Sequence, residues 1–168
     1  MRLILSFVQD SFKKAVAEAE EYSAWISFVT KLALQNMRER GIYPGKAPIG
    51  YSNIYLDDHK SIEPDEQAGK IQLLFDAFLQ PEIGIRKLLK IAQMVNLRTT
   101  TGKLISRKTL IHMLQNPFYH GYMKSGGRLY RHNYILLVND MIFQAVQKKL
   151  DRELGKVANK ETEVQVAA

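Results

Sequence analysis

The chain contains no cysteine among its 168 residues. Disulfide bonds are therefore excluded, and so is every metal site built from thiolates, such as a zinc ribbon. The four histidines (His59, His112, His120 and His132) stand in separate segments, without the short spacing that would form half of a metal site. Their pattern predicts surface or hydrogen-bonded histidines, and we expect neither a metal nor another cofactor.

Long apolar runs are also missing. The N-terminal stretch Met1–Leu5 is the start of such a run, but Ser6, Gln9 and Asp10 cut it short. It is too brief for a signal peptide or a membrane-spanning helix. We therefore expect a soluble, cytoplasmic protein with no membrane partner.

Acidic residues are absent from Ile83 to Asn139, although this stretch carries ten cations. They are Arg86, Lys87, Lys90, Arg98, Lys103, Arg107, Lys108, Lys124, Arg128 and Arg131. Because the whole chain has a net charge of +7, the remainder is mildly acidic. A long block without acids is typical of a surface that meets a polyanion, since each carboxylate there would repel phosphate. The alternative is a basic surface that only keeps the protein soluble. Nothing in the pattern indicates a small-molecule substrate.

Residues 10–40 form one helical stripe, with apolar side chains every three or four positions and no proline or glycine before Gly41. Such a helix is roughly 45 Å long, which exceeds what a small domain covers. The sequence therefore predicts that part of its apolar side meets another protein, as a homodimer or with other subunits. The alternative is packing against its own domain. The candidate contact residues are Phe12, Tyr22, Trp25, Phe28 and Val29.

The rest of the chain predicts a mainly α fold with small β-hairpins, of the α+β class. A hairpin is expected over 51–62, followed by helices from Pro64 to about 80, 84–96 and 106–116. Strands are expected over 118–123 and 129–134, and a last helix from Asn139 to about Glu153. We divide the chain into a long helix (1–41), a domain (42–154) and a polar tail (155–168) predicted to be disordered.

The helix predicted from Ser106 carries the sharpest functional pattern. Leu110, Leu114 and Phe118 share one side and are expected to anchor it. The other side suits a major groove, because arginine pairs with guanine, glutamine with adenine, and an aliphatic group touches a thymine methyl. With the preceding helix it predicts a helix-turn-helix with a long turn, and the glycine-tipped hairpin after it stands where a wing would. An ordinary solvated helix is the alternative. The candidates on this helix are Ser106, Arg107, Lys108, Thr109, Ile111, His112 and Gln115.

Two further sets are candidates for contact with DNA. The first is an extended connector whose prolines and glycines fit a minor groove, although it also suits a plain linker: Pro44, Gly45, Lys46, Ala47, Pro48 and Tyr51. The second consists of cations expected to bind phosphates: Arg86, Lys87, Arg98, Lys103, Lys124, Arg128 and Arg131.

These segments resemble the recombinase domain of the large serine recombinases. The resemblance rests on blocks that occur in the family's order over roughly residues 41–150: 41–51, 62–66, 84–88, 106–121 and 143–147. It implies that residues 10–40 correspond to the helix that joins the catalytic domain to the DNA-binding part and contributes to subunit contacts. It also implies that Pro44–Tyr51 crosses DNA and that Ser106–Asn116 enters the major groove, in a nucleoid-associated protein of bacterial or phage type.

The chain departs from this family in two ways. The catalytic serine occurs there in a Tyr-x-Arg-x-Ser context, which nothing here matches, and the cysteine-bearing zinc ribbon is missing. We therefore expect no catalytic residue and no strand cleavage by this chain alone, but sequence-selective binding of double-stranded DNA in integration, inversion or resolution. A stand-alone helix-turn-helix regulator, or a protein that assembles with or inhibits recombinase subunits, remains an alternative.

Overall fold

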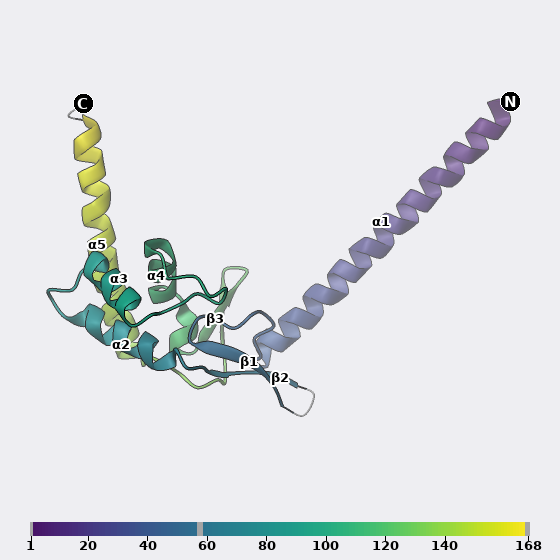
Figure 1. Ribbon diagram of the computed structural model, residues 1–168. Coiled ribbons are helices and arrows are strands. Elements are labelled where there is room, and N and C mark those ends of the chain that lie inside the picture. The colour runs from purple at the N-terminus through teal and green to yellow at the C-terminus, as the bar shows by residue number, and fades with distance from the viewer. Residues whose placement is uncertain (1, 57–58, 167–168) are drawn as a thin grey trace.

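The computed structural model describes the backbone of residues 2–56 and 59–166, and the side chains of residues 13–55 and 60–155. Phe12 and His59 therefore lie outside the described side chains. One long helix projects from a body that holds the other helices and two hairpins (Figure 1). Among the described residues, none of the helices is both long and apolar enough to cross a bilayer. The mainly α fold with two small antiparallel hairpins is the one that the sequence predicted.

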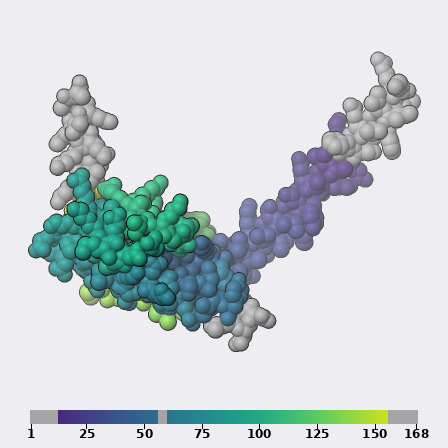
Figure 2. Space-filling view, in the orientation of Figure 1, coloured from purple at the N-terminus to yellow at the C-terminus, as the bar shows by residue number. Residues whose placement is uncertain are grey.

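Helix α1 (Arg2–Glu39) has 38 residues and is about 57 Å long. It extends ahead of the apolar stripe of residues 10–40, because residues 2–9 also lack proline and glycine. Its end was predicted correctly. Gly41 adopts φ +78°, and the Gly41 and Ile42 N–H groups donate to the carbonyls of Arg38 and Met37, which is a Schellman motif. The space-filling view shows α1 standing clear of the body (Figure 2).

The first hairpin, which was predicted over 51–62, pairs β1 (Tyr51–Leu56) with β2 (His59–Pro64), and β2 extends two residues further than predicted. The next helix, α2 (Ala68–Leu79), starts later than predicted. Pro64 is opposite Tyr51 in the hairpin, and the Asp65 carboxylate accepts the N–H of Gln67 at 2.7 Å. The acids that were expected in the first turn of α2 therefore form the turn before it.

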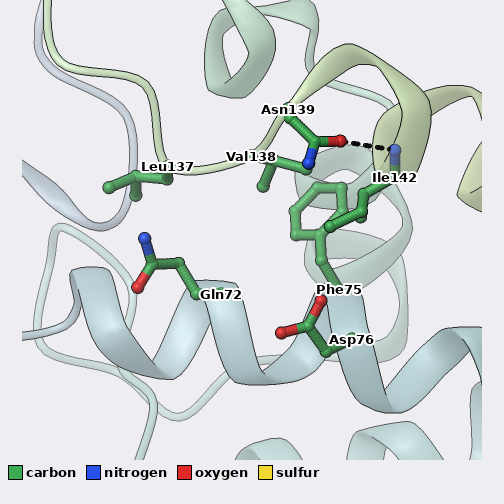
Figure 3. A pocket seen from close by; sticks show the side chains of 7 residues that line it. All are labelled: Gln72, Phe75, Asp76, Leu137, Val138, Asn139 and Ile142. Atoms are coloured by element: carbon green, nitrogen blue, oxygen red, sulfur yellow. Dashed lines mark hydrogen bonds between the residues drawn. The ribbon is translucent and has the colours of Figure 1, made fainter.

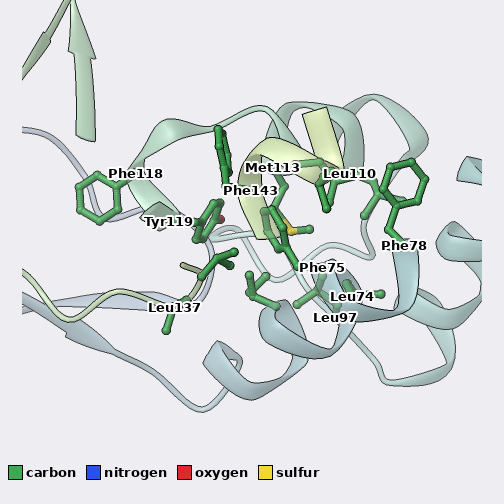
Figure 4. Close-up of a cluster of buried hydrophobic side chains, with 14 of the residues drawn as sticks. Leu74, Phe75, Phe78, Leu97, Leu110, Met113, Phe118, Tyr119, Leu137 and Phe143 are labelled. Atoms are coloured by element: carbon green, nitrogen blue, oxygen red, sulfur yellow. The ribbon is translucent and has the colours of Figure 1, made fainter. Parts of the chain in front are cut away.

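The core lies between α2, α3 (Ile85–Met94), α4 (Arg107–Leu114) and α5 (Asp140–Val166). Figure 4 shows its aromatic and aliphatic side chains interleaved. The buried side chains of α2 and α3 recur at helical spacing: Ile71, Leu74, Phe75 and Phe78 on α2, and Ile85, Leu88 and Ala92 on α3, while Leu89 and Val95 are half-buried. The ammonium group of Lys149 on α5 donates to the carbonyls of Gln80 and Ile83. It thereby places a positive charge at the negative end of α2.

The prediction of a strand over 118–123 was wrong in its first half. Residues Pro117–His120 form a short 3-10 helix, η1, and β3 covers only Tyr122–Ser125. Asn116 starts η1 by accepting the N–H of Phe118 at 3.1 Å. A strand would expose every second side chain, whereas Phe118, Tyr119 and His120 are all buried. The partner strand β4 (Arg128–Arg131) also ends before Tyr134.

Helix α5 begins as predicted, with the Asn139 side chain accepting the N–H of Ile142 at 2.8 Å. It continues through Val166, past Glu153, where the sequence predicted its end and a disordered tail. Apart from Gly155, the residues from 154 to 166 include no helix breaker. Helix α2 and the segment that leads into α5 border a hollow of about 200 Å³, lined by apolar side chains and by the polar residues Gln72, Asp76 and Asn139 (Figure 3).

Candidate nucleic-acid interface

Helix α4 is held by one side and leaves the other side open. Leu110, Met113 and Leu114 are buried, and the side-chain amide of Gln147 on α5 donates to the Leu114 carbonyl at 2.8 Å. At the other end the Ser106 hydroxyl accepts the N–H of Thr109 at 3.2 Å, which is the predicted N-cap. These contacts fix both ends of a helix that has only eight residues.

Four of the side chains that were predicted to read bases are exposed on this helix: Arg107, Lys108, His112 and Gln115. Two others are not free. Ile111 is half-buried and packs against the core, and the Thr109 hydroxyl bonds to that of Ser106 at 2.9 Å. The exposed stripe is therefore narrower and more polar than predicted, because the core reaches around a short helix. Ile111 is in a poor position to meet a thymine methyl.

The turn before α4 is a small ordered structure. The N–H of Thr99 donates to the Lys103 carbonyl and that of Gly102 to the Thr99 carbonyl, both at 2.8 Å. The Arg98 backbone N–H donates to the Gln67 side chain at 2.7 Å, and its guanidinium donates to the Gly102 carbonyl at 2.9 Å. The guanidinium of Arg98 is thus already hydrogen-bonded to the turn, and its remaining N–H groups are the ones left for a phosphate. Lys103 is exposed, as are Arg86 and Lys87 on α3, which packs against α4.

The hairpin β3–β4 divides its cations between two faces. Tyr122 pairs with Arg131 and Lys124 with Leu129, so these four side chains share one face. Arg128 pairs with Ser125 and belongs to the opposite face, the one that carries the buried Met123. Lys124 and Arg131 can therefore face one phosphate backbone together, while Arg128 is exposed at the tip. Tyr122 and Leu129 were not predicted as site residues, although the alternation around the Gly126–Gly127 turn indicates their face.

The connector before β1 is part of the domain core, which corrects two of its candidates. Ala47 and Tyr51 are only 5% and 3% exposed. The Tyr51 hydroxyl donates to the Ile135 carbonyl at 2.8 Å, and burial raises the pKa of this phenol. These two side chains therefore do not face a DNA groove. Lys46 is exposed, while Pro44, Gly45 and Pro48 are half-buried.

The backbone of the connector is also tied down. The Tyr119 hydroxyl donates to the Ile49 carbonyl at 2.8 Å, and the Lys60 ammonium donates to the Gly45 carbonyl. Such hydrogen bonds from distant side chains leave no signal in the sequence of the segment itself.

A groove of about 760 Å³ separates the start of α2 from the turn before α4. Its lining includes the side chains of Asp65 and Glu66 beside those of Lys70 and Arg98. Two carboxylates make this groove a poor place for a phosphate backbone. Among the described residues, no three His, Asp or Glu side chains gather in a way that suits a metal ion.

Two histidines are buried, His120 at the end of η1 and His132 directly after β4. His132 stacks on Phe118 with ring centroids 4.3 Å apart, and His120 stacks on Phe143 at 3.8 Å. Burial is the main cause that lowers the pKa of both imidazoles below the ordinary value of 6.5. Asp140, whose carboxylate lies 3.8 Å from His120 Nε2, offsets only part of this for His120. Both rings are therefore held in the neutral form near neutral pH.

This burial predicts a stability that falls as the solution is acidified. A histidine with a lowered pKa in the folded state takes up its proton more readily when the chain unfolds. The stabilisation is complete above pH 6.5, and it is lost as the pH falls from there toward the folded-state values. Thermal unfolding followed by circular dichroism should show a lower midpoint at about pH 5.5 than at about pH 7.5. Replacing His120 with Phe, which keeps the stack on Phe143, should weaken this dependence; an unaltered pH profile would contradict the assignment.

Comparison with known proteins identifies the family of the chain. The profile of the family named Recombinase matches residues 65–153, more than half of the chain. No curated protein matches. Among solved structures, a crystal structure of an LSR–DNA complex is similar, with 20% identity and a TM-score of 0.59 over 73% of this chain and 38% of that one. A structure from work on the sequence requirements of the Listeria innocua prophage attP site is also similar, with 20% identity and a TM-score of 0.57 over 72% of this chain and 51% of that one. The chain thus spans between about a third and a half of these structures. It belongs to the Recombinase family.

Proposed function

We propose that this chain binds double-stranded DNA with sequence selectivity, as the DNA-binding part of a serine site-specific recombinase. The observation that carries the proposal is the open side of α4, where Arg107, Lys108, His112 and Gln115 are exposed on a helix fixed at both ends. These side chains are suited to base edges in the major groove. The surrounding stretch from Ile83 to Asn139 contains no acid that would repel phosphate.

The remaining cations support this placement with different geometry. Arg86, Lys87 and Lys103 lie on elements next to α4, and Lys124 and Arg131 share a face of the β3–β4 hairpin. These are positions for phosphate contacts, which set the register of a protein on DNA without reading its sequence. Lys46 is the connector residue best placed to reach a minor groove, since it is the exposed cation of that segment.

Binding of labelled duplexes, measured by fluorescence anisotropy at several salt concentrations, tests the proposal. Neutralising several phosphates releases counterions, so affinity should fall steeply between about 50 and 200 mM salt. Selection from a random duplex library should then enrich one motif. Duplex binding that is undetectable or insensitive to salt would contradict the proposal, and binding without an enriched motif would contradict its sequence selectivity.

We propose further that these residues do not cut DNA by themselves. Transesterification needs a nucleophile with cations around the scissile phosphate, and the sequence contains no serine in the Tyr-x-Arg-x-Ser context of the family. Incubating the chain with duplex DNA and searching for covalent protein–DNA adducts tests the absence of cleavage.

The proposed division between the long helix (1–41) and the domain (42–154) is supported by the motif that ends α1 at Gly41.

The second proposed contact is between α1 and another protein chain, either a second copy or a recombinase subunit. Residues 13–33 are all exposed, including Tyr22, Trp25, Phe28 and Val29, and the rings of Tyr22 and Trp25 stack at 6.2 Å. Trp25 is 58% and Phe28 64% exposed. Contiguous exposed aromatic surface of this kind is typical of an interface.

Replacing Trp25 and Phe28 together with Ala is expected to weaken self-association by at least about ten-fold, since buried aromatic anchors dominate such contacts. Sedimentation velocity over a range of concentrations measures this. Lys31→Ala on the same helix is the control. A wild-type chain that stays monomeric both alone and with a full-length recombinase would contradict the proposed contact.

A further inference from the structure

The segments that follow α1 and α4 meet through four aromatic residues, which we call the aromatic bridge: Tyr43, Phe118, His132 and Tyr134. Tyr43 lies two residues after Gly41, which ends α1, and Phe118 lies four residues after the last residue of α4. Phe118 is 2% exposed. Its ring meets that of Tyr43 edge-on at 5.1 Å and stacks on His132 and Tyr134.

Three hydrogen bonds join residues of the aromatic bridge to one another. His132 Nε2 lies 2.8 Å from the Phe118 carbonyl, and the Tyr134 N–H donates to His132 Nδ1 at 3.2 Å. Because Nδ1 accepts, the ring proton is on Nε2, and His132 donates it to Phe118. In the third, the Tyr43 N–H donates to the Tyr134 hydroxyl at 2.9 Å. One imidazole and one phenol thus connect the segment after α4 to the segment after α1.

The C-terminal end of α1 is also closely packed against the segment around Arg131 and Asn133. A Cβ added at Gly41 would lie 3.0 Å from the Asn133 side chain and 3.3 Å from the Arg131 carbonyl. Gly41 is therefore pressed against the segment that carries His132 and Tyr134, and α1 itself contacts β4. These few contacts at its C-terminal end set the direction of α1, because the side chains of residues 13–33 are all exposed.

We propose that Tyr134 and His132 are positioning residues that set the direction of α1 relative to α4. This inference rests on the proposed function and deepens it. If α4 occupies a major groove and α1 meets another subunit, the angle between them decides where that subunit lies along the same DNA. A turn of about 10° at the base displaces the far end of a helix of this length by about 10 Å, so one hydrogen bond at the base has a large effect at a distance.

Tyr134→Phe removes the hydroxyl that accepts the Tyr43 N–H and keeps the ring in the aromatic bridge. Hydrogen exchange followed by NMR should show the Tyr43 amide exchanging about five-fold faster, which is the effect of losing a hydrogen bond of ordinary net strength on a local opening. The Leu110 amide, which bonds to the Ser106 carbonyl inside α4, should keep its rate. It reports whether the whole domain has lost stability.

The direction of α1 is measured separately with two spin labels. Since the chain contains no cysteine, Lys31→Cys on α1 and Lys148→Cys on α5 introduce the only two thiols. Double electron–electron resonance gives the distribution of distances between the labels. We expect Tyr134→Phe to widen or shift this distribution relative to the same doubly labelled chain without it. Tyr55→Phe, at a β1 residue that is 77% exposed, is the matched control and should leave it unchanged.

A distance distribution that does not respond to Tyr134→Phe would overturn the proposal, whatever the exchange rate. A change of distribution with an unaltered Tyr43 exchange rate would also overturn it, because the direction would then not depend on this hydrogen bond. Neither measurement involves DNA. A failure of DNA binding and a failure of the positioning role are therefore distinguished.

Discussion

Replacing Arg107 and Lys108 together with Gln is expected to lower the affinity for duplex DNA by roughly 100-fold. Each cation in good contact with a base or phosphate contributes about a factor of ten. Both side chains are exposed at the first turn of α4, where Ser106 caps the helix. The slope of log affinity against log salt should fall by about 0.9 for each of the two that contacts a phosphate.

The matched control is the pair Lys31→Gln and Lys148→Gln, which changes the net charge by the same amount on α1 and α5. It separates the position of the charge from its total. Equal losses for the two pairs would mean that only the overall positive field matters, and the placement of α4 in a groove would be wrong. A larger loss on the selected motif than on unrelated duplex would assign base reading to α4.

The second large effect is expected from Phe118→Ala, which should reduce the free energy of unfolding by about 3–5 kcal/mol. The ring is buried against the aromatic rings of Tyr43, Tyr51, His132 and Tyr134. Its removal leaves a cavity where the connector, η1 and the segment after β4 meet. Urea unfolding followed by circular dichroism measures the loss.

Met141→Ala is the control for Phe118→Ala, because this methionine is 81% exposed at the start of α5. It should change the unfolding free energy by no more than about 0.5 kcal/mol. A loss below about 1 kcal/mol for Phe118→Ala would show that the neighbouring rings collapse into the space. The aromatic bridge would then be a poor candidate for a rigid connection.

Several local features follow directly from residues that are close in the sequence. Gly41 stops α1, Ser106 caps α4, and Asn139 caps α5. In each case a side chain or a positive φ satisfies the helix end within a few positions, so the signal is contained in the segment itself. The exposed cations of α4 follow in the same way from helical spacing, once its apolar side is assigned to the core.

The errors have a common cause in contacts between distant segments. The burial of Tyr51 depends on the Ile135 carbonyl, which is 84 residues away. The three consecutive buried residues of η1 depend on rings supplied by the connector and α5. Neither partner is visible from the periodicity of the segment, so Ala47 and Tyr51 were predicted as DNA contacts and η1 as part of a β-strand.

The amino-acid sequence by itself determined the helices, their caps, the acid-free basic stretch and the family. These depend on short-range geometry and on charge, which neighbouring residues already contain. Only the tertiary structure decided that Ala47 and Tyr51 belong to the core and that the Tyr134 hydroxyl accepts the N–H of Tyr43. Those outcomes depend on which surfaces the chain brings together when it packs, and a burial or hydrogen bond between distant residues exists only after that packing.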